Sequence, residues 1–324
     1  MIAYIVESAD GPFREVHLPQ SVPREGEVLV RISASGINPL DTKIRAGQAA
    51  HAKQPLPAVL GLDMAGVVES VGPGVSKFLP GDEVYGMVGG VGGLQGTLAE
   101  MISVDVSLLA HKPNALTMRQ AAALPLATIT AWEGLVDQCN VRAGQTVLIH
   151  AGTGGVGYAS VQIAVARGAK VYATVSQEKR LLMEDLGVTP IDRFASVADY
   201  VAEHTAGEGF DVVYDTVGGA VLDASFVAVK RYTGHVVSCL GWGTHALAPL
   251  SFRSATYSGV FTLYPLLSGH NRSHHGEILA EATKLADNGQ LKPFLSTERF
   301  GRNEIAAACD SVARGSNGKV VVEF

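Results

Sequence analysis

The sequence predicts an α/β protein of two domains, one rich in β-strands and one built on a doubly wound parallel sheet. The chain has 324 residues, more than a single hydrophobic core usually organises. Its texture also changes near residue 120, from short β-rich runs between Gly and Pro turns to apolar runs that alternate with helical spacing. We therefore expect two domains of different architecture.

Residues 1–122 form the first part of the β-rich domain. The runs VLVRISA, AGVVESVG and EVYGMV are typical of strands and helix signals are scarce, so we expect a small barrel or sandwich. The last segment, residues 266–324, ends in the apolar run KVVVEF. We expect this segment to return to the first domain, because a terminal strand needs a sheet to join.

Residues 123–265 form the second predicted domain. The apolar runs TVLIH, KVYATV, FDVVYDTV and HVVSCL are separated by stretches with helical spacing. Strands that alternate with helices predict βαβ units, right-handed crossovers and a parallel sheet.

Charge and cysteine content exclude several classes of function. The net charge of −6 and the absence of a long run of Lys and Arg argue against nucleic acid as a partner. No stretch approaches 18 apolar residues, so we expect a soluble, cytoplasmic protein without membrane contact. Cys139, Cys239 and Cys309 are widely scattered, which indicates buried thiols rather than disulfides or a metal knuckle. The neighbouring His270, His274 and His275 lack a matching Cys or acid cluster, and we expect them at the surface.

The segment GTGGVG satisfies G-x-G-x-x-G between a predicted strand and a predicted helix. Glycine suits such a turn because the backbone must approach a pyrophosphate closely and the helix must pack on its strand. The phosphate then lies at the positive end of the helix. The predicted phosphate-binding residues of this Rossmann-type turn are Gly152, Thr153, Gly154, Gly155, Val156 and Gly157.

The residue about 20 positions further on determines the choice of cofactor, because NAD enzymes place an acidic side chain there against the ribose. Ser176 occupies this position, followed by Lys179 and Arg180. A hydroxyl and two cations could hold a 2′-phosphate, so the pattern predicts NADPH. In the alternative, Glu178 reaches the ribose from the start of a solvated helix.

Further cofactor contacts are expected where strands of the parallel sheet end. Asp215 and Val217 follow the run FDVVY, and Gly241 follows HVVSCL. For Asp215 the alternative is the N-cap of the next helix.

Several blocks together resemble a known family: SGINPLDTKIRAG, GLDMAGVVESVGPGV, PGDEVYG, LPLATITAWEGL, GTGGVG, FDVVYDTVGG and GKVVV. In order and spacing they are similar to the quinone oxidoreductase branch of the medium-chain dehydrogenases/reductases. The resemblance implies a GroES-like catalytic domain made from both chain ends, a Rossmann domain between them, and an active cleft where the two meet.

The resemblance also implies roles for single residues. It puts Asn38 at the nicotinamide, where its amide could donate a hydrogen bond to a developing oxyanion, and Thr130 where it would orient the nicotinamide ring. It assigns Arg314 to the cofactor phosphate. For Asn38 the alternative is an ordinary turn residue before Pro39.

Zinc-dependent relatives carry Cys, His and Glu at the positions of Asn38, Leu62 and Asp63, and a cluster of four cysteines that is absent here. We therefore expect a zinc-free enzyme. Without a Lewis acid, reduction of a simple ketone is difficult, whereas a quinone or other activated α,β-unsaturated carbonyl needs less help.

Some features leave the assignment open. Lys43 stands where relatives often carry Tyr and hints at a more polar acceptor, while Arg193 replaces a Tyr beside the adenosine phosphate and could add a cation for the 2′-phosphate. The alternatives are an enoyl-thioester or alkenal reductase of the same superfamily, or a low-turnover NADPH-binding sensor. The segment YSGVFTLY could form an edge strand that pairs with its mate in a homodimer.

Overall fold

The computed structural model describes residues 1–324 and divides into two compact units. The first unit comprises Met1–Leu126 and Leu263–Phe324, and the second comprises Ala127–Thr262. The boundaries expected from the sequence, after residues 122 and 265, fall a few residues from these. No helix is both long and apolar enough to cross a bilayer.

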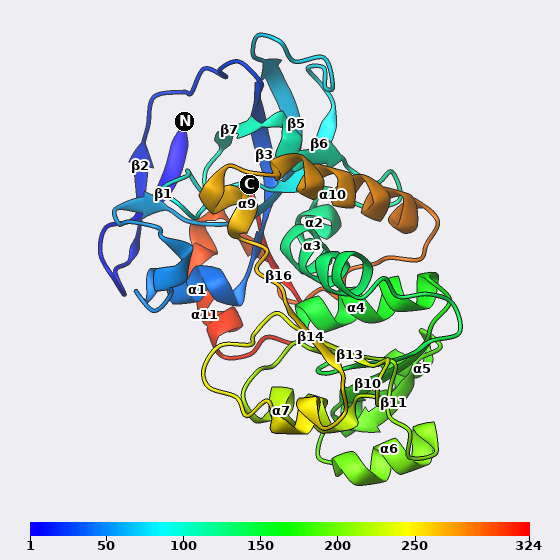
Figure 1. Ribbon diagram of the computed structural model, residues 1–324. Coiled ribbons are helices and arrows are strands. Elements are labelled where there is room, and N and C mark those ends of the chain that lie inside the picture. Colours follow the sequence, from blue (N-terminus) through cyan, green and yellow to red (C-terminus); the bar gives the residue numbers. More distant parts are fainter. The chain divides into compact units, whose positions relative to one another are not determined.

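Two sheets form the first unit (Figure 1). The larger sheet has the order β15-β16-β3-β5-β6-β8, with β7 also paired to β3. As expected, the last strand returns to this sheet, where β16 pairs antiparallel with β3. The strands of the larger sheet are β3 (Glu27–Ile37), β5 (Asp63–Val71), β6 (Glu83–Met87), β7 (Met101–Asp105), β8 (Leu109–His111), β15 (Phe300–Gly301) and β16 (Val320–Glu323). The smaller sheet, in the order β2-β1-β4, consists of β1 (Ile2–Val6), β2 (Phe13–His17) and β4 (Ala58–Val59).

Five helices belong entirely to the first unit, and α3 (Pro125–Trp132) begins in it and continues into the second. The five are α1 (Pro39–Arg45), α2 (Met118–Ala122), α9 (Tyr264–Ser268), α10 (Arg272–Asp287) and α11 (Ile305–Ala313). Helix α10 packs so closely that a Cβ on Gly276 would lie 2.3 Å from the Ser107 carbonyl oxygen. His275 beside it is fully buried, so the expectation of a surface histidine was wrong for this residue. Its place on the packed face of α10, which a local pattern did not reveal, explains the error.

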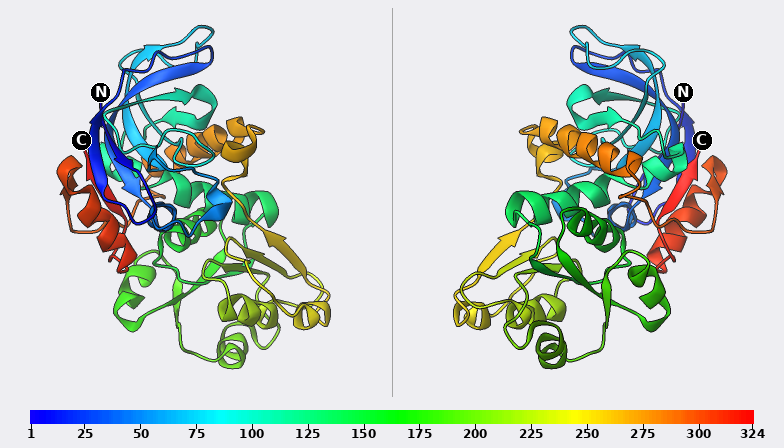
Figure 2. Two further views of the ribbon diagram at one scale, coloured as in Figure 1. Left: turned by 90° about the vertical axis from the view of Figure 1, so that its left-hand side faces the viewer. Right: turned by 90° about the vertical axis from the view of Figure 1, so that its right-hand side faces the viewer.

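The second unit contains a six-stranded, entirely parallel sheet in the order β11-β10-β9-β12-β13-β14, which confirms the predicted α/β fold. Helix α4 lies on one face of this sheet, and α6 and α7 lie on the other (Figures 1 and 2). The strands are β9 (Thr146–Ile149), β10 (Lys170–Val175), β11 (Thr189–Asp192), β12 (Val212–Asp215), β13 (His235–Ser238) and β14 (Thr256–Gly259). The helices are α4 (Gly155–Ala166), α5 (Arg180–Glu184), α6 (Val197–Thr205), α7 (Ala220–Ala228) and α8 (Ala248–Ser251).

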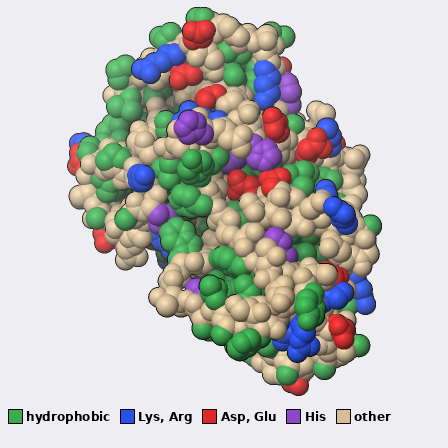
Figure 3. All heavy atoms as spheres, in the orientation of Figure 1, with side chains coloured by type: hydrophobic (Ala, Val, Ile, Leu, Met, Phe, Trp, Pro, Cys, Tyr) green, Lys and Arg blue, Asp and Glu red, His purple; other side chains and the backbone are tan.

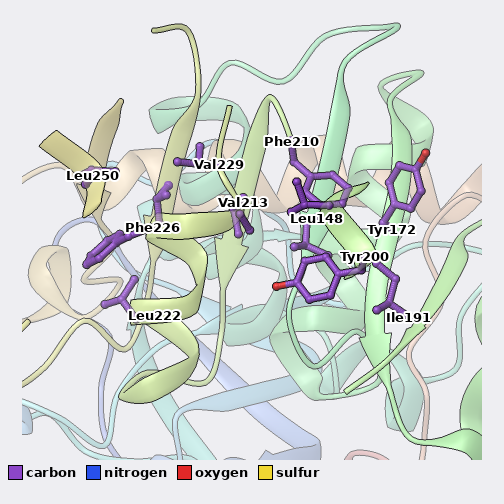
Figure 4. Packing of buried hydrophobic residues seen from close by; sticks show 13 residues of the cluster. Leu148, Tyr172, Ile191, Tyr200, Phe210, Val213, Leu222, Phe226, Val229 and Leu250 are labelled. Atoms are coloured by element: carbon purple, nitrogen blue, oxygen red, sulfur yellow. The ribbon is translucent and has the colours of Figure 1, made fainter. Parts of the chain in front are cut away.

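A buried apolar cluster joins helices α6 and α7 to this sheet (Figure 4). The ring of Phe210 lies 5.2 Å from that of Tyr172 and 6.2 Å from that of Tyr200, centroid to centroid. Aromatic pairs at such distances add to the stabilisation that burial gives. The cluster thereby secures α6 and α7 on this face of the sheet.

The surface and the thiols agree with the composition. On the face in Figure 3, Lys and Arg side chains lie among Asp and Glu and form no continuous basic stripe. All three cysteines are free thiols, and burial raises the pKa of each to about 12. A thiol with such a pKa is a poor nucleophile at neutral pH.

Candidate functional site

The glycine-rich turn of the second unit connects β9 to α4. A Cβ on Gly152 would lie 2.6 Å from the Cβ of Ala173, and one on Gly157 would lie 2.1 Å from the carbonyl oxygen of Ala151. Neither position has room for a side chain, so the helix packs directly on its strand. Gly154 is the N-cap of α4, and the first amides of the helix have no partner one turn earlier. These amides form a cradle that suits the phosphates of a dinucleotide.

The neighbouring strand β10 holds this turn in place. The backbone N–H of Ala151 donates to the Thr174 hydroxyl at 3.0 Å, and that of Gly152 donates to the Thr174 carbonyl at 3.1 Å. Ala151 itself has a φ of 52°, an unusual conformation for a residue with a side chain. The buried His150 imidazole lies 3.3 Å from the same hydroxyl, and burial lowers its pKa to about 4, so it is neutral. Sequence reasoning missed Thr174 and His150.

The residues expected to select the cofactor are only partly brought together. Ser176 follows β10, and Arg193 follows β11 and donates its backbone N–H to the Val175 carbonyl at 3.0 Å. Both therefore lie at one end of adjacent strands. The Ser176 hydroxyl donates to Glu178 at 3.0 Å. The Arg193 guanidinium lies 4.7 Å from the centre of the Phe194 ring.

The two other cations differ from each other. Burial lowers the pKa of Lys179, and the charge of Glu178 opposes this shift. Arg180 lies 3.7 Å from Glu184 within α5 and 3.4 Å from the Pro190 carbonyl oxygen. Arg180 is thus engaged by Glu184 and Pro190, whereas Lys179 is joined to Ser176 by its backbone N–H, which donates to the Ser176 carbonyl at 3.0 Å.

Asp215 at the end of β12 is fully buried and closes the turn that follows it. Its carboxylate accepts the backbone N–H of Val217 at 3.0 Å and of Gly218 at 2.9 Å, and the Ser238 hydroxyl at 2.7 Å. The N-cap of α7 is Gly219, so the helix-cap alternative was wrong in detail. Val217 is 46% exposed and offers a surface at this strand end.

The next strand end is also constrained. A methyl group on Gly241 would lie 2.1 Å from the Tyr257 hydroxyl, so a larger residue there must displace the tyrosine.

Thr130 lies in α3 and is 5% exposed. Its carbonyl accepts the Tyr214 hydroxyl at 2.7 Å, and its own hydroxyl lies 3.0 Å from that of Thr262. The Thr262 hydroxyl also lies 2.5 Å from the Glu133 carboxylate. This polar cluster fixes the orientation of the Thr130 side chain relative to strand β12.

In the first unit, Asn38 takes part in a buried polar network with Asp63 and Lys319. The amide nitrogen of Asn38 donates to Asp63 Oδ2 at 3.0 Å, and its second contact, the Gly36 carbonyl, is at 3.5 Å. The Lys319 ammonium donates to Asn38 Oδ1 and to Asp63 Oδ2, the latter at 3.3 Å. The second carboxylate oxygen of Asp63 accepts the Leu126 N–H at 2.9 Å, at the start of α3.

Burial sets the electrostatics of this network. It raises the pKa of Asp63, which the Lys319 charge and the Asn38 amide oppose. Nearby Asp41, also buried, accepts the Asn38 backbone N–H at 2.8 Å, and burial raises its pKa to about 7. Asn38 is the N-cap of α1 directly before Pro39, yet its side chain serves the network and not the cap. The turn alternative therefore describes the backbone of Asn38 only.

Lys319 was missed from the sequence, although it is the second residue of the segment GKVVV. Leu62, beside Asp63, is fully buried and apolar. No group of three His, Cys, Asp or Glu side chains lies in an arrangement that could hold a metal ion. Arg314, the C-cap of α11, is exposed and has no acidic partner.

A cavity of about 450 Å³ opens beside α1, lined by Ile44, Gly47, Ala49, Ala50, Lys53, Gln54 and Pro55. Lys43 is exposed on the same helix. Burial and the Lys43 charge both lower the pKa of His51, which places Lys43 near this segment.

Comparison with known proteins identifies related families and relatives of this chain. The model "Alcohol dehydrogenase GroES-like domain" matches residues 24–114, and the model "Zinc-binding dehydrogenase" matches residues 155–273. The chain is 35% identical over 310 residues to 2-methylene-furan-3-one reductase of Solanum lycopersicum and to the chloroplastic NADPH-dependent alkenal/one oxidoreductase of Arabidopsis thaliana. Each alignment covers 92% of this chain and 72% of the relative.

The chain belongs to the medium-chain dehydrogenase/reductase superfamily. It is accordingly an NAD(P)-dependent oxidoreductase with a GroES-like and a Rossmann-type domain. Among solved structures of this superfamily, an alcohol dehydrogenase superfamily protein from Novosphingobium aromaticivorans is 58% identical, with a TM-score of 0.98 over 100% of this chain and 99% of that one.

Two further proteins show the range of similarity. A mycobacterial quinone oxidoreductase is 30% identical, with a TM-score of 0.85 and complete coverage of both chains. A mycocerosic acid synthase-like polyketide synthase of Mycobacterium tuberculosis is 42% identical over 203 residues, which are 61% of this chain. The chain spans only 9% of the length of that synthase.

Proposed function

We propose that this protein is an NADPH-dependent reductase of quinones and other activated α,β-unsaturated carbonyls that works without zinc. The observation that carries the proposal is the network of Asn38, Asp63 and Lys319. Asn38, which takes the position of the thiolate of zinc-dependent relatives, is bound here to a carboxylate and an ammonium, and Leu62, at the position of their imidazole, is apolar. A site without a strong Lewis acid favours an acceptor whose double bond is already electron-poor.

When bound, NADPH supplies a hydride, which adds to carbon while the π electrons move to the carbonyl oxygen and a solvent proton completes the reduction. The turn from Gly152 to Gly157 would hold the pyrophosphate through backbone amides. Ser176, Lys179 and Arg193 would meet the 2′-phosphate. Thr130 would orient the nicotinamide ring.

Asn38 is proposed to act on the oxygen of the acceptor. Its oxygen is engaged by Lys319 and one of its amide hydrogens by Asp63, so the amide cannot flip. The other hydrogen makes a long 3.5 Å contact with Gly36, and the Asn38 side chain also interacts with the Asp41 carboxylate. An oxyanion of the bound acceptor would compete for this hydrogen. The cavity next to α1, with Lys43 nearby, is the candidate place for the rest of the acceptor.

The names of the relatives support enones and alkenals at least as strongly as quinones, so an alkenal reductase is the second candidate. The test is NADPH consumption with a panel of quinones, enones, alkenals and enoyl thioesters. Steady turnover with one of these classes supports the proposal and identifies the acceptor. NADPH binding without consumption across the whole panel would instead indicate a sensor.

NADPH is expected to bind at least about tenfold more tightly than NADH, because charge-assisted hydrogen bonds to the 2′-phosphate contribute roughly 1.5 kcal/mol or more. Ser176→Asp should reverse this preference, since a carboxylate repels phosphate and accepts from a free ribose hydroxyl. Fluorescence titration of both cofactors measures the change. Equal dissociation constants in the unaltered protein would contradict the assignment.

Turnover is expected to survive prolonged chelation, and the purified protein should contain no stoichiometric zinc. The physical reason is that neither Asn38 nor Leu62 offers a ligand that zinc prefers. Elemental analysis together with activity after dialysis against a chelator tests this. About one zinc per chain, with activity lost on its removal, would refute the zinc-free proposal.

We also propose a homodimer formed through β14, which is one of the two edge strands of the parallel sheet. Three of its four residues are exposed, and an exposed edge must be covered or paired. Sedimentation at micromolar concentration should give a dimer, and Gly259→Pro should weaken it, because residues 256 and 260 donate to β13, the alternate residue 259 faces the free edge, and proline removes its backbone donor. A sharp monomer for the unaltered protein would exclude this assembly.

A further inference from the structure

The position of Lys319 is set by the pairing of three neighbouring strands. Val320 of β16 lies opposite Ile37 of β3, and Gly36 of β3 lies opposite Asp63 of β5. Residues 319, 38 and 63 therefore meet at the same end of adjacent strands. Lys319 lies directly before β16 and forms a β-bridge with Leu295, in which its N–H donates to the Phe294 carbonyl at 2.7 Å and its carbonyl accepts the Ser296 N–H at 3.0 Å. These bonds hold the backbone of Lys319, and with it the ammonium, in a defined place.

The ammonium of Lys319 has a donor to spare. Of its three N–H groups, two are accounted for by Asn38 Oδ1 and Asp63 Oδ2, and the third has no protein acceptor. The Lys319 side chain is 10% exposed, whereas that of Asp63 is completely buried. The third N–H is thus the part of the network best able to meet a ligand.

We propose that Lys319 is a catalytic residue whose third N–H donates a hydrogen bond to the acceptor's carbonyl oxygen as negative charge develops there. The inference rests on the reductase function proposed above. Hydride addition moves the π electrons onto that oxygen, and the fixed positive charge stabilises it while the proton that completes the reduction comes from solvent. A positive charge in a largely dry site acts more strongly than one in water. Asn38 and Asp63 hold the ammonium in place, much as ligands hold a metal.

The test must separate this role from charge balance, since Lys319→Met alone leaves the buried Asp63 unpaired and can unfold the protein. In Asp63→Asn alone the new NH2 group would face the Lys319 ammonium and the Asn38 amide, which are both donors, so this single variant is not a valid reference. The informative comparison is therefore between the unaltered protein and the double variant Lys319→Met with Asp63→Asn, which removes both charges together and keeps an oxygen for the Leu126 N–H. We expect the double variant to fold, with a turnover number about 100-fold lower than that of the unaltered protein and an unchanged dissociation constant for NADPH. An unchanged turnover number would overturn the proposal.

A second measurement distinguishes oxyanion stabilisation from a structural effect. Turnover by the unaltered protein and by the double variant is measured with but-3-en-2-one and with 1,4-benzoquinone. The quinone gives a more delocalised oxyanion, so the loss caused by removing Lys319 should be several-fold smaller with it than with the enone. The same loss with both acceptors would assign Lys319 a positioning role and overturn the catalytic one.

Lys112 provides a matched control in the same unit. Its side chain is 7% exposed and lies 3.1 Å from Glu83, so Lys112→Met also removes a mostly buried, paired lysine. This variant should lose thermal stability without losing turnover. If the unaltered protein reduces neither acceptor, the proposed function fails, whereas normal turnover with no specific effect of Lys319 refutes this inference alone.

Discussion

Gly157→Ala is expected to weaken NADPH binding by at least about 100-fold, or roughly 2.8 kcal/mol. The added methyl group would lie 2.1 Å from the Ala151 carbonyl oxygen, and both atoms belong to the turn itself. The conflict is therefore relieved only by moving backbone, which takes the amides of α4 away from the phosphates. Fluorescence titration with NADPH measures the loss.

Gly155→Ala shows whether such a loss comes from the close approach. A methyl group there would meet nothing nearer than the Cβ of Ala127 at 4.0 Å, so this variant should melt at the temperature of the unaltered protein or above it. Gly157→Ala should melt several degrees lower. Tight NADPH binding and unaltered melting in Gly157→Ala would show that the turn adapts and that the steric explanation is incorrect.

Asn38→Ala is expected to lower the turnover number by about 10- to 100-fold and to leave NADPH binding nearly unchanged. The amide contributes most when charge develops on the acceptor, so its removal affects the transition state more than the ground state. The alanine also takes away the oxygen that Lys319 uses, and the ammonium loses one of its two anchors. Steady-state kinetics measure the loss of turnover, and a separate NADPH titration shows whether cofactor binding is unchanged.

Asn288→Ala is a suitable control because this exposed residue caps α10 in the same unit, away from the network. It should retain full turnover. If Asn38→Ala also retained full turnover and only melted earlier, Asn38 would be no more than the residue that begins α1, and catalysis would depend on cofactor positioning.

The parts of the fold that depend on local patterns could be predicted. The spacing of Gly152, Gly154 and Gly157 between a strand and a helix is such a pattern, and the structure shows the steric reason for two of the three glycines. Alternation of apolar runs and helical stretches likewise predicted the parallel sheet, because each crossover is short in the sequence.

The network around Asn38 could not be predicted in the same way. Lys319 is 281 residues from Asn38, and it meets Asn38 only through the register of β16 on β3. Asp41 looks like an ordinary acid near a helix start, but burial, together with the nearby charge of Asp63, raises its pKa to about 7. Arg180 shows the converse, since a cation in the expected stretch turns to Glu184 instead.

The return of the chain to its first sheet also affects how the protein is made. Residues 127–262 leave the ribosome before β16 does. The parallel-sheet unit can therefore fold while β3, in the larger sheet of the first unit, still lacks β16 on one side. During this interval Asp63 has no ammonium beside it, and an unpaired carboxylate resists burial. The first unit thus stays open at the edge of β3 during translation, and docking of the last strand closes it and brings in the counter-charge in a single late step.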